Sequence, residues 1–189
     1  MRKLVQILVM LSMVVFATQV AFAHSDKETI EEGADLTSIH RLAVASPRYF
    51  PVGKEDPTKE QLTDIVFKAS RVARSYVVSY DSVAEGIRAD KNLDIKVLDL
   101  KKAEQAFKEN VSKYADAYVE LWVANNSRTT FFFNVHRAGT NELLYVYEIR
   151  ANRSDKDNEK TFTTLSEQFY KHFEHAANEQ QKKAAKAGK

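Results

Sequence analysis

The sequence predicts a protein of the α/β (α+β) class, with one mixed β-sheet and helices packed on it. Residues 114–149 hold the densest run of β-branched and aromatic side chains, which suit a pleated, half-buried surface. Strand-like and helical patterns alternate before this run, and a helical pattern follows it. The predicted element order is β-α-β-α-α-β-β-β-α, and such an order implies a mixed sheet covered by helices.

The first 23 residues have the pattern of a secretory signal peptide. Arg2 and Lys3 precede an apolar run over Leu4–Val15, and Ala-Phe-Ala at 21–23 is a small-x-small cleavage pattern. The apolar run is short for a membrane span, which needs roughly 20 residues. We therefore expect export to the periplasm or the medium, cleavage after Ala23, and no stable membrane span afterwards.

Charge and cysteine content exclude several classes of function. The chain has 28 Lys+Arg and 26 Asp+Glu, and cleavage would remove two basic residues and balance the charge. Nucleic-acid binding requires concentrated positive charge, so we expect no nucleic-acid partner. Cysteine is absent, which excludes disulfides and an N-terminal lipid anchor on cysteine. A signal peptide without cysteine suits a bacterial envelope protein better than a eukaryotic secreted one.

The first segments after the signal peptide alternate between polar and apolar. Residues 24–38 are polar and acidic and are predicted to form a flexible arm. The short apolar run Ile39–Ala45 predicts a buried strand that ends before Pro47. Residues 48–56 contain proline and glycine and are predicted to form a loop.

A helix is predicted to begin after Thr58, because Thr58 and Gln61 have capping-box spacing. Val77–Tyr80 is short and β-branched, which predicts a second strand. The helix predicted after Thr58 has apolar side chains at helical spacing on one face: Leu62, Ile65, Val66, Ala69, Val72, Ala73 and Tyr76.

Two further helices are predicted before the strand-rich block. Asp81 or Ser82 is expected to cap a brief helix that ends near residues 86–90. After a connector over 93–98, Asp99 is expected to cap another helix. Its apolar stripe comprises Leu100, Ala103, Phe107, Val111 and Tyr114.

The strand-rich block is predicted to form three consecutive strands over Asp116–Ala124, Thr129–Arg137 and Glu142–Arg150. Gly139 lies in the second turn, where a tight hairpin requires a positive φ. These strands are expected to form an antiparallel meander.

The chain is predicted to end in one helix and a tail. The helix is expected over Thr161–Ala177, with Phe169 and Phe173 on its buried side, followed by a basic solvated tail over 178–189. A single domain over 39–177 follows from this assignment, because no internal repeat separates two halves.

The order of elements and a short motif resemble a known group of envelope domains. The similarity extends over Ile39–Ala45, the helix after Thr58, Val77–Tyr80 and the segment 94–119, where Ala115-Asp116 follows a helix and begins the strand meander. The chain resembles the anticodon-binding-like domain of the TolB N-terminal region, CsgG and LpoB. This resemblance implies a binding or assembly module of the bacterial envelope and not a catalyst. We expect a protein or peptide partner and no cofactor.

The candidate binding residues are Tyr118, Trp122 and His136. Strand alternation places Tyr118 and Trp122 on the side opposite the small and aliphatic residues of the same strand. His136 joins them only if the next strand pairs in the matching register. Aromatic rings beside polar groups are typical of binding surfaces. The alternative is that a helix covers this face and that the rings belong to the core.

Metal binding and hydrolysis are the competing functions. His172 and His175 have i, i+3 spacing on the last predicted helix, but a closed metal site needs about four ligands and the sequence offers no obvious third. His24 would be the N-terminal residue after cleavage and a possible copper ligand. His136 is the candidate residue of a hydrolase, although no Gly-x-Ser-x-Gly motif is present.

The export hypothesis predicts the N-terminus of the mature protein. We expect N-terminal sequencing of the periplasmic or secreted protein to give His24 as its first residue, since signal peptidase cleaves after small-x-small patterns. An exported product that keeps Met1 would contradict this assignment.

Overall fold

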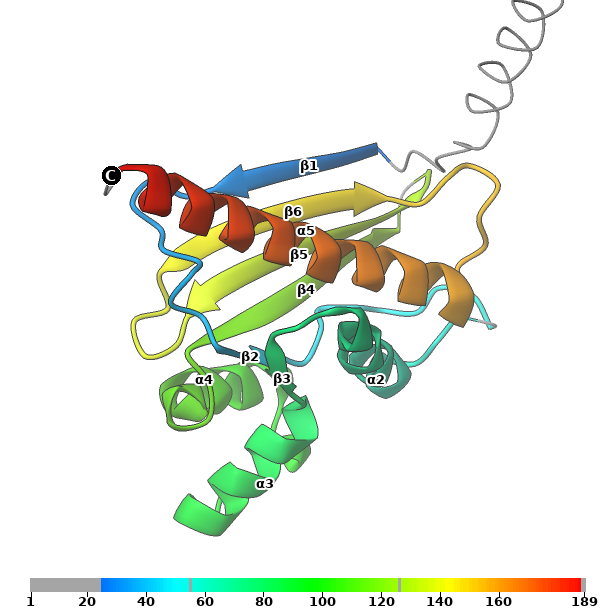
Figure 1. The fold of residues 1–189 in the computed structure, drawn as a ribbon. Helices are drawn as coiled ribbons and strands as arrows, with labels where there is room; N and C mark the ends of the chain where they lie inside the picture. The colour runs from blue at the N-terminus through cyan, green and yellow to red at the C-terminus, as the bar shows by residue number, and fades with distance from the viewer. Residues whose placement is uncertain (1–24, 55, 126, 188–189) are drawn as a thin grey trace, which may run out of the picture.

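The computed structural model describes residues 25–54, 56–125 and 127–187. The predicted signal peptide, its cleavage site and His24 lie outside the described residues. The predicted fold class is confirmed, because the described chain has one six-stranded mixed sheet with four α-helices packed against it (Figure 1). No helix in this part of the chain is both long and apolar enough to cross a membrane.

The strands lie side by side in the order β1-β6-β5-β4-β2-β3. Their bounds are β1 Ser25–Ile30, β2 Arg41–Val44, β3 Tyr76–Val78, β4 Ala117–Asn125, β5 Thr129–Arg137 and β6 Leu143–Arg150. The α-helices are α2 Lys59–Ala69, α3 Tyr80–Lys91, α4 Leu100–Asn110 and α5 Glu159–Ala187. Short 3₁₀ turns span η1 Ser70–Val72, η2 Ile95–Val97 and η3 Val111–Lys113.

The parallel part of the sheet is centred on β2, which pairs with β3 on one side and with β4 on the other. The Asp116 carboxylate accepts the backbone N–H groups of His40 at 3.0 Å and Arg41 at 2.8 Å. These bonds fix the beginning of β2 against β4, with Leu42 opposite Ala117. The Ala115-Asp116 pair therefore has a structural function at the junction of two distant strands.

The antiparallel part confirms the predicted meander. β4, β5 and β6 agree with the three predicted strands to within about one residue at each end, as expected for assigned boundaries. Gly139 has a φ of +88° in the turn between β5 and β6, a backbone conformation that glycine adopts without a steric penalty.

The predicted flexible arm over 24–38 is corrected by the structure. Ser25–Ile30 forms the edge strand β1 and pairs antiparallel with β6. His172 of α5 contacts this strand through both ring nitrogens: Nδ1 lies 3.1 Å from Glu28, and Nε2 lies 3.3 Å from Asp26. Residues 26–30 are all exposed, so the sequence of β1 does not alternate between apolar and polar side chains. That alternation is the signal by which a half-buried strand is recognised in a sequence.

The ends of two helices also differ from prediction. Ser79, and not Asp81 or Ser82, caps α3, because its hydroxyl accepts the Ser82 N–H at 3.1 Å. α5 continues to Ala187 through most of the predicted tail. Gln180 stabilises this extension, since its side chain accepts the Leu36 N–H and donates to the Ala34 carbonyl, each at 2.9 Å.

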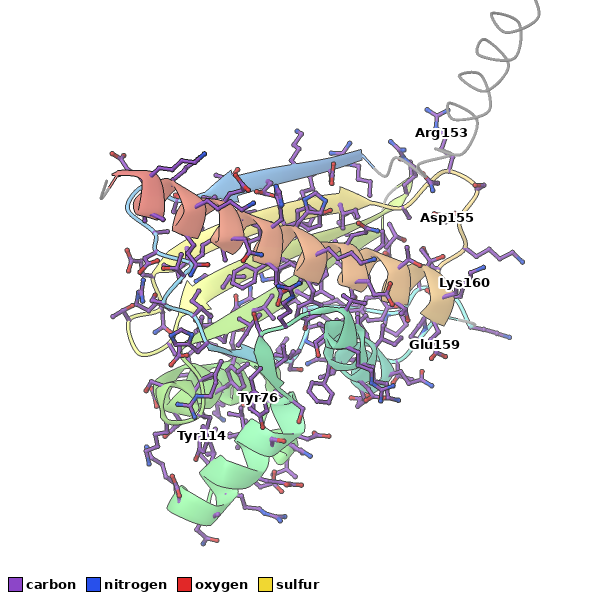
Figure 2. The ribbon with its side chains drawn as sticks, in the orientation of Figure 1. Tyr76, Tyr114, Arg153, Asp155, Glu159 and Lys160 are labelled. Carbon is purple, nitrogen blue, oxygen red and sulfur yellow. The ribbon has the colours of Figure 1, made fainter. Side chains whose placement is uncertain are left out.

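A close contact joins α3 to Tyr114, which directly follows η3. The Tyr114 ring lies against Gly86, where an added Cβ would be only 2.5 Å from a ring carbon. The Tyr114 hydroxyl also donates to Asp90 at 3.1 Å. Figure 2 shows Tyr114 beside α3 and α4, and the charged loop before α5, marked by Arg153 and Asp155, far from them.

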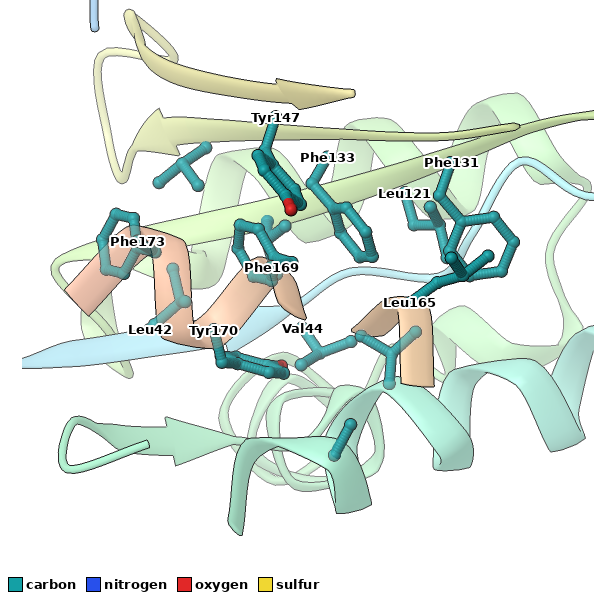
Figure 3. Packing of buried hydrophobic residues seen from close by; sticks show 14 of the residues in the cluster. Leu42, Val44, Leu121, Phe131, Phe133, Tyr147, Leu165, Phe169, Tyr170 and Phe173 are labelled. Atoms are coloured by element: carbon teal, nitrogen blue, oxygen red, sulfur yellow. The ribbon is translucent and has the colours of Figure 1, made fainter. Parts of the chain in front are cut away.

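The core consists of two clusters, one on each face of the sheet. α2 and α5 cover the larger cluster, in which Phe169 stacks on Phe133 with ring centroids 4.3 Å apart (Figure 3). α3 and α4 cover the smaller cluster at the β2 end of the opposite face, where Phe107 is 2% exposed. Phe107, Phe169 and Leu121 are all buried, as predicted.

We expect Phe169→Ala and Phe107→Ala each to lower the free energy of unfolding by about 3–5 kcal/mol and Leu121→Ala by about 2–5 kcal/mol, because each leaves a cavity in packed core. Chemical denaturation followed by circular dichroism measures these losses. Val97→Ala is the matched control, since Val97 is 79% exposed. Core variants that unfold like this control would contradict the helix-on-sheet packing.

Candidate functional site

The candidate binding residues lie on the side of the sheet that faces away from α5. Tyr118 pairs directly with His136 of β5, and Trp122 pairs with Phe132. The register that the binding hypothesis requires is therefore present, and Tyr118, Trp122 and His136 share one face of the sheet. The structure gives these three residues different environments.

Tyr118 is fully buried, which corrects the expectation that all three residues line an open surface. Its ring meets Phe107 of α4 edge-on at 5.9 Å and stacks on His136 at 5.2 Å. Its hydroxyl donates to Asn141 at 2.9 Å. Burial, reinforced by the charges of Glu120 and Glu104, raises the pKa of Tyr118 well above its usual value. The ring belongs to the core under α4.

Trp122 is 42% exposed, and Arg48 holds it in place. The Arg48 guanidinium carbon lies 4.4 Å from the centre of the indole ring, in cation–π geometry. The backbone of Arg48 is also fixed to β4, since it donates to the Leu121 carbonyl at 2.8 Å and accepts from Val123 at 3.1 Å. The indole is thus both accessible and preorganised.

A chain of ion pairs joins Arg48 to the rest of this face. Arg48 lies 2.5 Å from Glu104, and Lys108 lies 2.8 Å from Glu104 and 2.6 Å from Glu120. Glu120 ends the chain 3.7 Å from His136 Nε2. Because the side chain of Glu120 is only 8% exposed, its charge depends on Lys108 for compensation.

The pKa values of the central pair reflect these contacts. Burial alone would raise the pKa of Glu104, but hydrogen bonds from Lys108 and Arg48 outweigh it, and the pKa lies below its ordinary value. Burial likewise opposes the charged form of Lys108, but the bonds to Glu104 and Glu120 raise its pKa. Both groups are charged at neutral pH.

The His136 ring contacts the turn between β5 and β6. Its Nδ1 lies 3.2 Å from the Asn141 carbonyl, which can only accept, so Nδ1 donates. Across the described residues, no serine, threonine or cysteine side chain forms a hydrogen bond with the His136 ring. The arrangement of nucleophile and base that a hydrolase would require at His136 is therefore not formed in this part of the chain.

A shallow groove of about 320 Å³ lies beside Arg48 and is lined by Arg48, Phe50, Leu100, Lys101 and Glu104. We call these five residues the anchor groove. Phe50 is 77% exposed and Leu100 is 41% exposed, so both present apolar surface at the groove. Sequence analysis missed Arg48 and Phe50, because they lie in a loop without periodicity. The one available signal was an aromatic residue between two prolines.

The candidate metal ligands do not converge. Both nitrogens of His172 face carboxylates of β1, and its ring stacks on Tyr147 at 4.7 Å. His175, one turn further, is exposed. Within residues 25–54, 56–125 and 127–187 no three His, Cys, Asp or Glu side chains could hold a metal ion together.

Comparisons with known proteins give distant structural likeness only. No protein-family model matches the sequence, and no curated protein matches it significantly. The PelC dodecamer of Paraburkholderia phytofirmans has a TM-score of 0.45 at 9% identity, over 77% of this chain and 93% of that chain. A second crystal structure of the PelC dodecamer gives a TM-score of 0.44.

The LpoB C-terminal domain of Escherichia coli has a TM-score of 0.42 at 13% identity, over 65% of this chain and 87% of that chain. LpoB is one of the three proteins named in the predicted resemblance. The similarity to TolB and CsgG stays a prediction.

The ion-pair chain predicts a loss of stability in Lys108→Met. This change leaves the Glu120 carboxylate buried without its cation, so we expect the free energy of unfolding at pH 7 to fall by about 1–3 kcal/mol. Chemical denaturation measures the change. The matched control is Lys102→Met on the same helix, which removes only an exposed pair with Asp99 and should leave the stability nearly unchanged.

The destabilisation caused by Lys108→Met is also expected to depend on pH. The folded-state pKa of Glu104 lies below its ordinary value of 4.5, so its stabilising contribution is present above about pH 4.5 and is lost as the pH falls through the lower folded value. Lys108→Met weakens this contribution. The stability difference between wild type and variant should therefore narrow below pH 4.5. A constant difference between pH 7 and pH 3 would disagree with the ion-pair chain.

Proposed function

We propose that this chain is an exported, non-enzymatic binding or assembly module of the bacterial cell envelope. We further propose that it holds a protein partner on Trp122 and the anchor groove. The single observation that carries this proposal is that Trp122 is 42% exposed while Arg48 fixes its ring from one side. The signal-peptide pattern supports export, and the sequence resemblance around Ala115-Asp116 supports a role in the envelope.

A fixed, exposed tryptophan beside an arginine has the character of a protein-binding hot spot. Tryptophan and arginine are enriched among residues that dominate binding energies, because they supply large contact areas. The rotamers of Trp122 and Arg48 are already restricted by their mutual contact and by Glu104. Binding therefore costs less side-chain entropy than it would for mobile side chains.

The anchor groove defines the chemistry of the partner. Phe50 and Leu100 offer apolar walls, which fit an aliphatic or aromatic side chain. Arg48 is neutralised by Glu104, whereas Lys101 is exposed and has no ion pair among the described residues. The uncompensated charge of the groove is positive. The partner is therefore a protein that presents an apolar side chain next to a carboxylate.

The test is Trp122→Ala, with Tyr76→Ala as the matched control. Tyr76 is 67% exposed on the edge strand β3 and does not line the groove. Photo-crosslinking in envelope extracts identifies a candidate partner, and calorimetry with that purified protein measures affinity. We expect Trp122→Ala to weaken binding by about 30-fold or more and Tyr76→Ala to leave it unchanged.

A charge variant tests the partner chemistry. Lys101→Glu should weaken binding of the same partner, because it places a like charge opposite the carboxylate. Circular dichroism must show wild-type melting for Trp122→Ala. An unfolded variant would mean that the indole is core, and unchanged affinity would mean that the partner binds elsewhere. Loss of wild-type self-association in Trp122→Ala would instead identify a second copy of this chain as the occupant.

A further inference from the structure

A larger cavity of about 500 Å³ lies at the carboxyl ends of the parallel strands. Ala45 and Ser79 line it and directly follow β2 and β3. Glu120 also lines it and follows Val119, the last residue of β4 that pairs with β2. The cavity is therefore built from the three parallel strands at the same end.

The chain connections explain why a cavity forms there. β2 connects to β3 through α2, which packs on one face of the sheet, and β3 connects to β4 through α3 and α4 on the other face. Helices that leave toward opposite faces separate at the strand ends. In open α/β sheets, ligands bind in such crevices outside the carboxyl ends of the strands. The volume is within the usual range of small-molecule sites, roughly 300–1,000 Å³.

Part of the cavity lining is apolar and aromatic. Tyr80 of α3 stacks on Phe107 of α4 with ring centroids 5.7 Å apart, and Phe67 of α2 also contributes to the lining. Further apolar lining comes from Ile95, Leu98 and Ala103. This surface suits the body of a flat or elongated apolar ligand.

The charged residues of the lining have ion pairs among the described residues, except Glu60 and Lys59. Each acidic side chain of the lining has a cation or a hydrogen-bond donor, in the pairs Asp64–Lys68, Asp81–Lys96, Glu104–Arg48, Glu120–Lys108 and Glu60–Thr58. Lys59 is half-buried and has no ion pair among the described residues. Burial lowers the pKa of Lys59, and the charges of Glu60 and Glu104 oppose this only in part. A desolvated ammonium without an ion pair favours an anion beside it.

We propose that this cavity binds a small amphiphilic organic anion. Its apolar body lies against Phe67, Tyr80 and Phe107, and its anionic group meets the Lys59 ammonium. This ligand site is separate from the proposed protein-binding surface, although the two share the wall formed by Arg48, Leu100 and Glu104.

The test compares two probes with the same ring framework. 1-Anilinonaphthalene-8-sulfonate carries a negative charge, whereas N-phenyl-1-naphthylamine is its neutral counterpart, and both fluoresce on entering an apolar site. We expect both to bind the folded full-length protein with one-to-one stoichiometry. Lys59→Met should weaken the sulfonate about tenfold and leave the neutral probe nearly unchanged, because only the sulfonate uses the ammonium.

Three control variants locate the binding site. Lys102→Met removes an exposed charge of α4 that does not line the cavity, and it should leave the affinity for both probes unchanged. Ala103→Leu fills the cavity from α4 and should weaken both probes. Trp122→Ala removes the proposed protein contact outside the cavity and should leave both affinities unchanged. Circular dichroism establishes that each variant is folded.

An equal loss of affinity for the sulfonate probe in Lys59→Met and Lys102→Met would overturn the proposal, since binding would then follow net charge alone. Unchanged sulfonate affinity in Lys59→Met would also overturn it. If Ala103→Leu does not fold, the comparison of Lys59→Met with Lys102→Met still decides. A loss of affinity for both probes in Trp122→Ala would show that the probes bind on the protein-binding surface and not in the cavity. Failure of the partner test leaves these results unaffected, because Lys59 does not line the anchor groove.

Discussion

Two backbone hydrogen bonds to the Asp116 carboxylate determine how the chain is assembled. They join the beginning of β2 to the beginning of β4 across a separation of 75 residues for Arg41, and they set Leu42 opposite Ala117. A one-residue slip in this pairing would move every side chain of β2 to the other face. The two core clusters, and the positions of the helices over them, depend on this register.

The same junction positions the ion-pair chain. After β2 the backbone continues along β4 as far as Arg48, which forms a bridge with Trp122. Arg48 thereby comes within reach of Glu104 on α4, and α4 presents Lys108 to Glu120 of β4. Each charge compensates a neighbour that would otherwise be desolvated and unpaired, so the members stabilise one another rather than acting separately.

The anchor groove and the larger cavity share part of their lining. The Arg48–Glu104 ion pair and Leu100 line both. A ligand that moves the Glu104 carboxylate would also move the guanidinium that holds the Trp122 ring. Coupling between the two surfaces requires only that a ligand bind one arrangement of this ion pair more tightly than another.

The sequence by itself determined the fold class, most strands and the caps of two helices, Thr58 and Asp99, because these depend on local periodicity and on local capping motifs. It also determined that Tyr118 and Trp122 share a face, since strand alternation has a fixed period. Only the tertiary structure decided that α4 buries Tyr118 and leaves Trp122 exposed, because alternation shows which residues share a side and not what covers it. It alone placed β1, whose exposed edge residues show no apolar pattern. It alone assembled the site around Arg48, because an ion-pair chain over four separate positions leaves no local signal in the sequence.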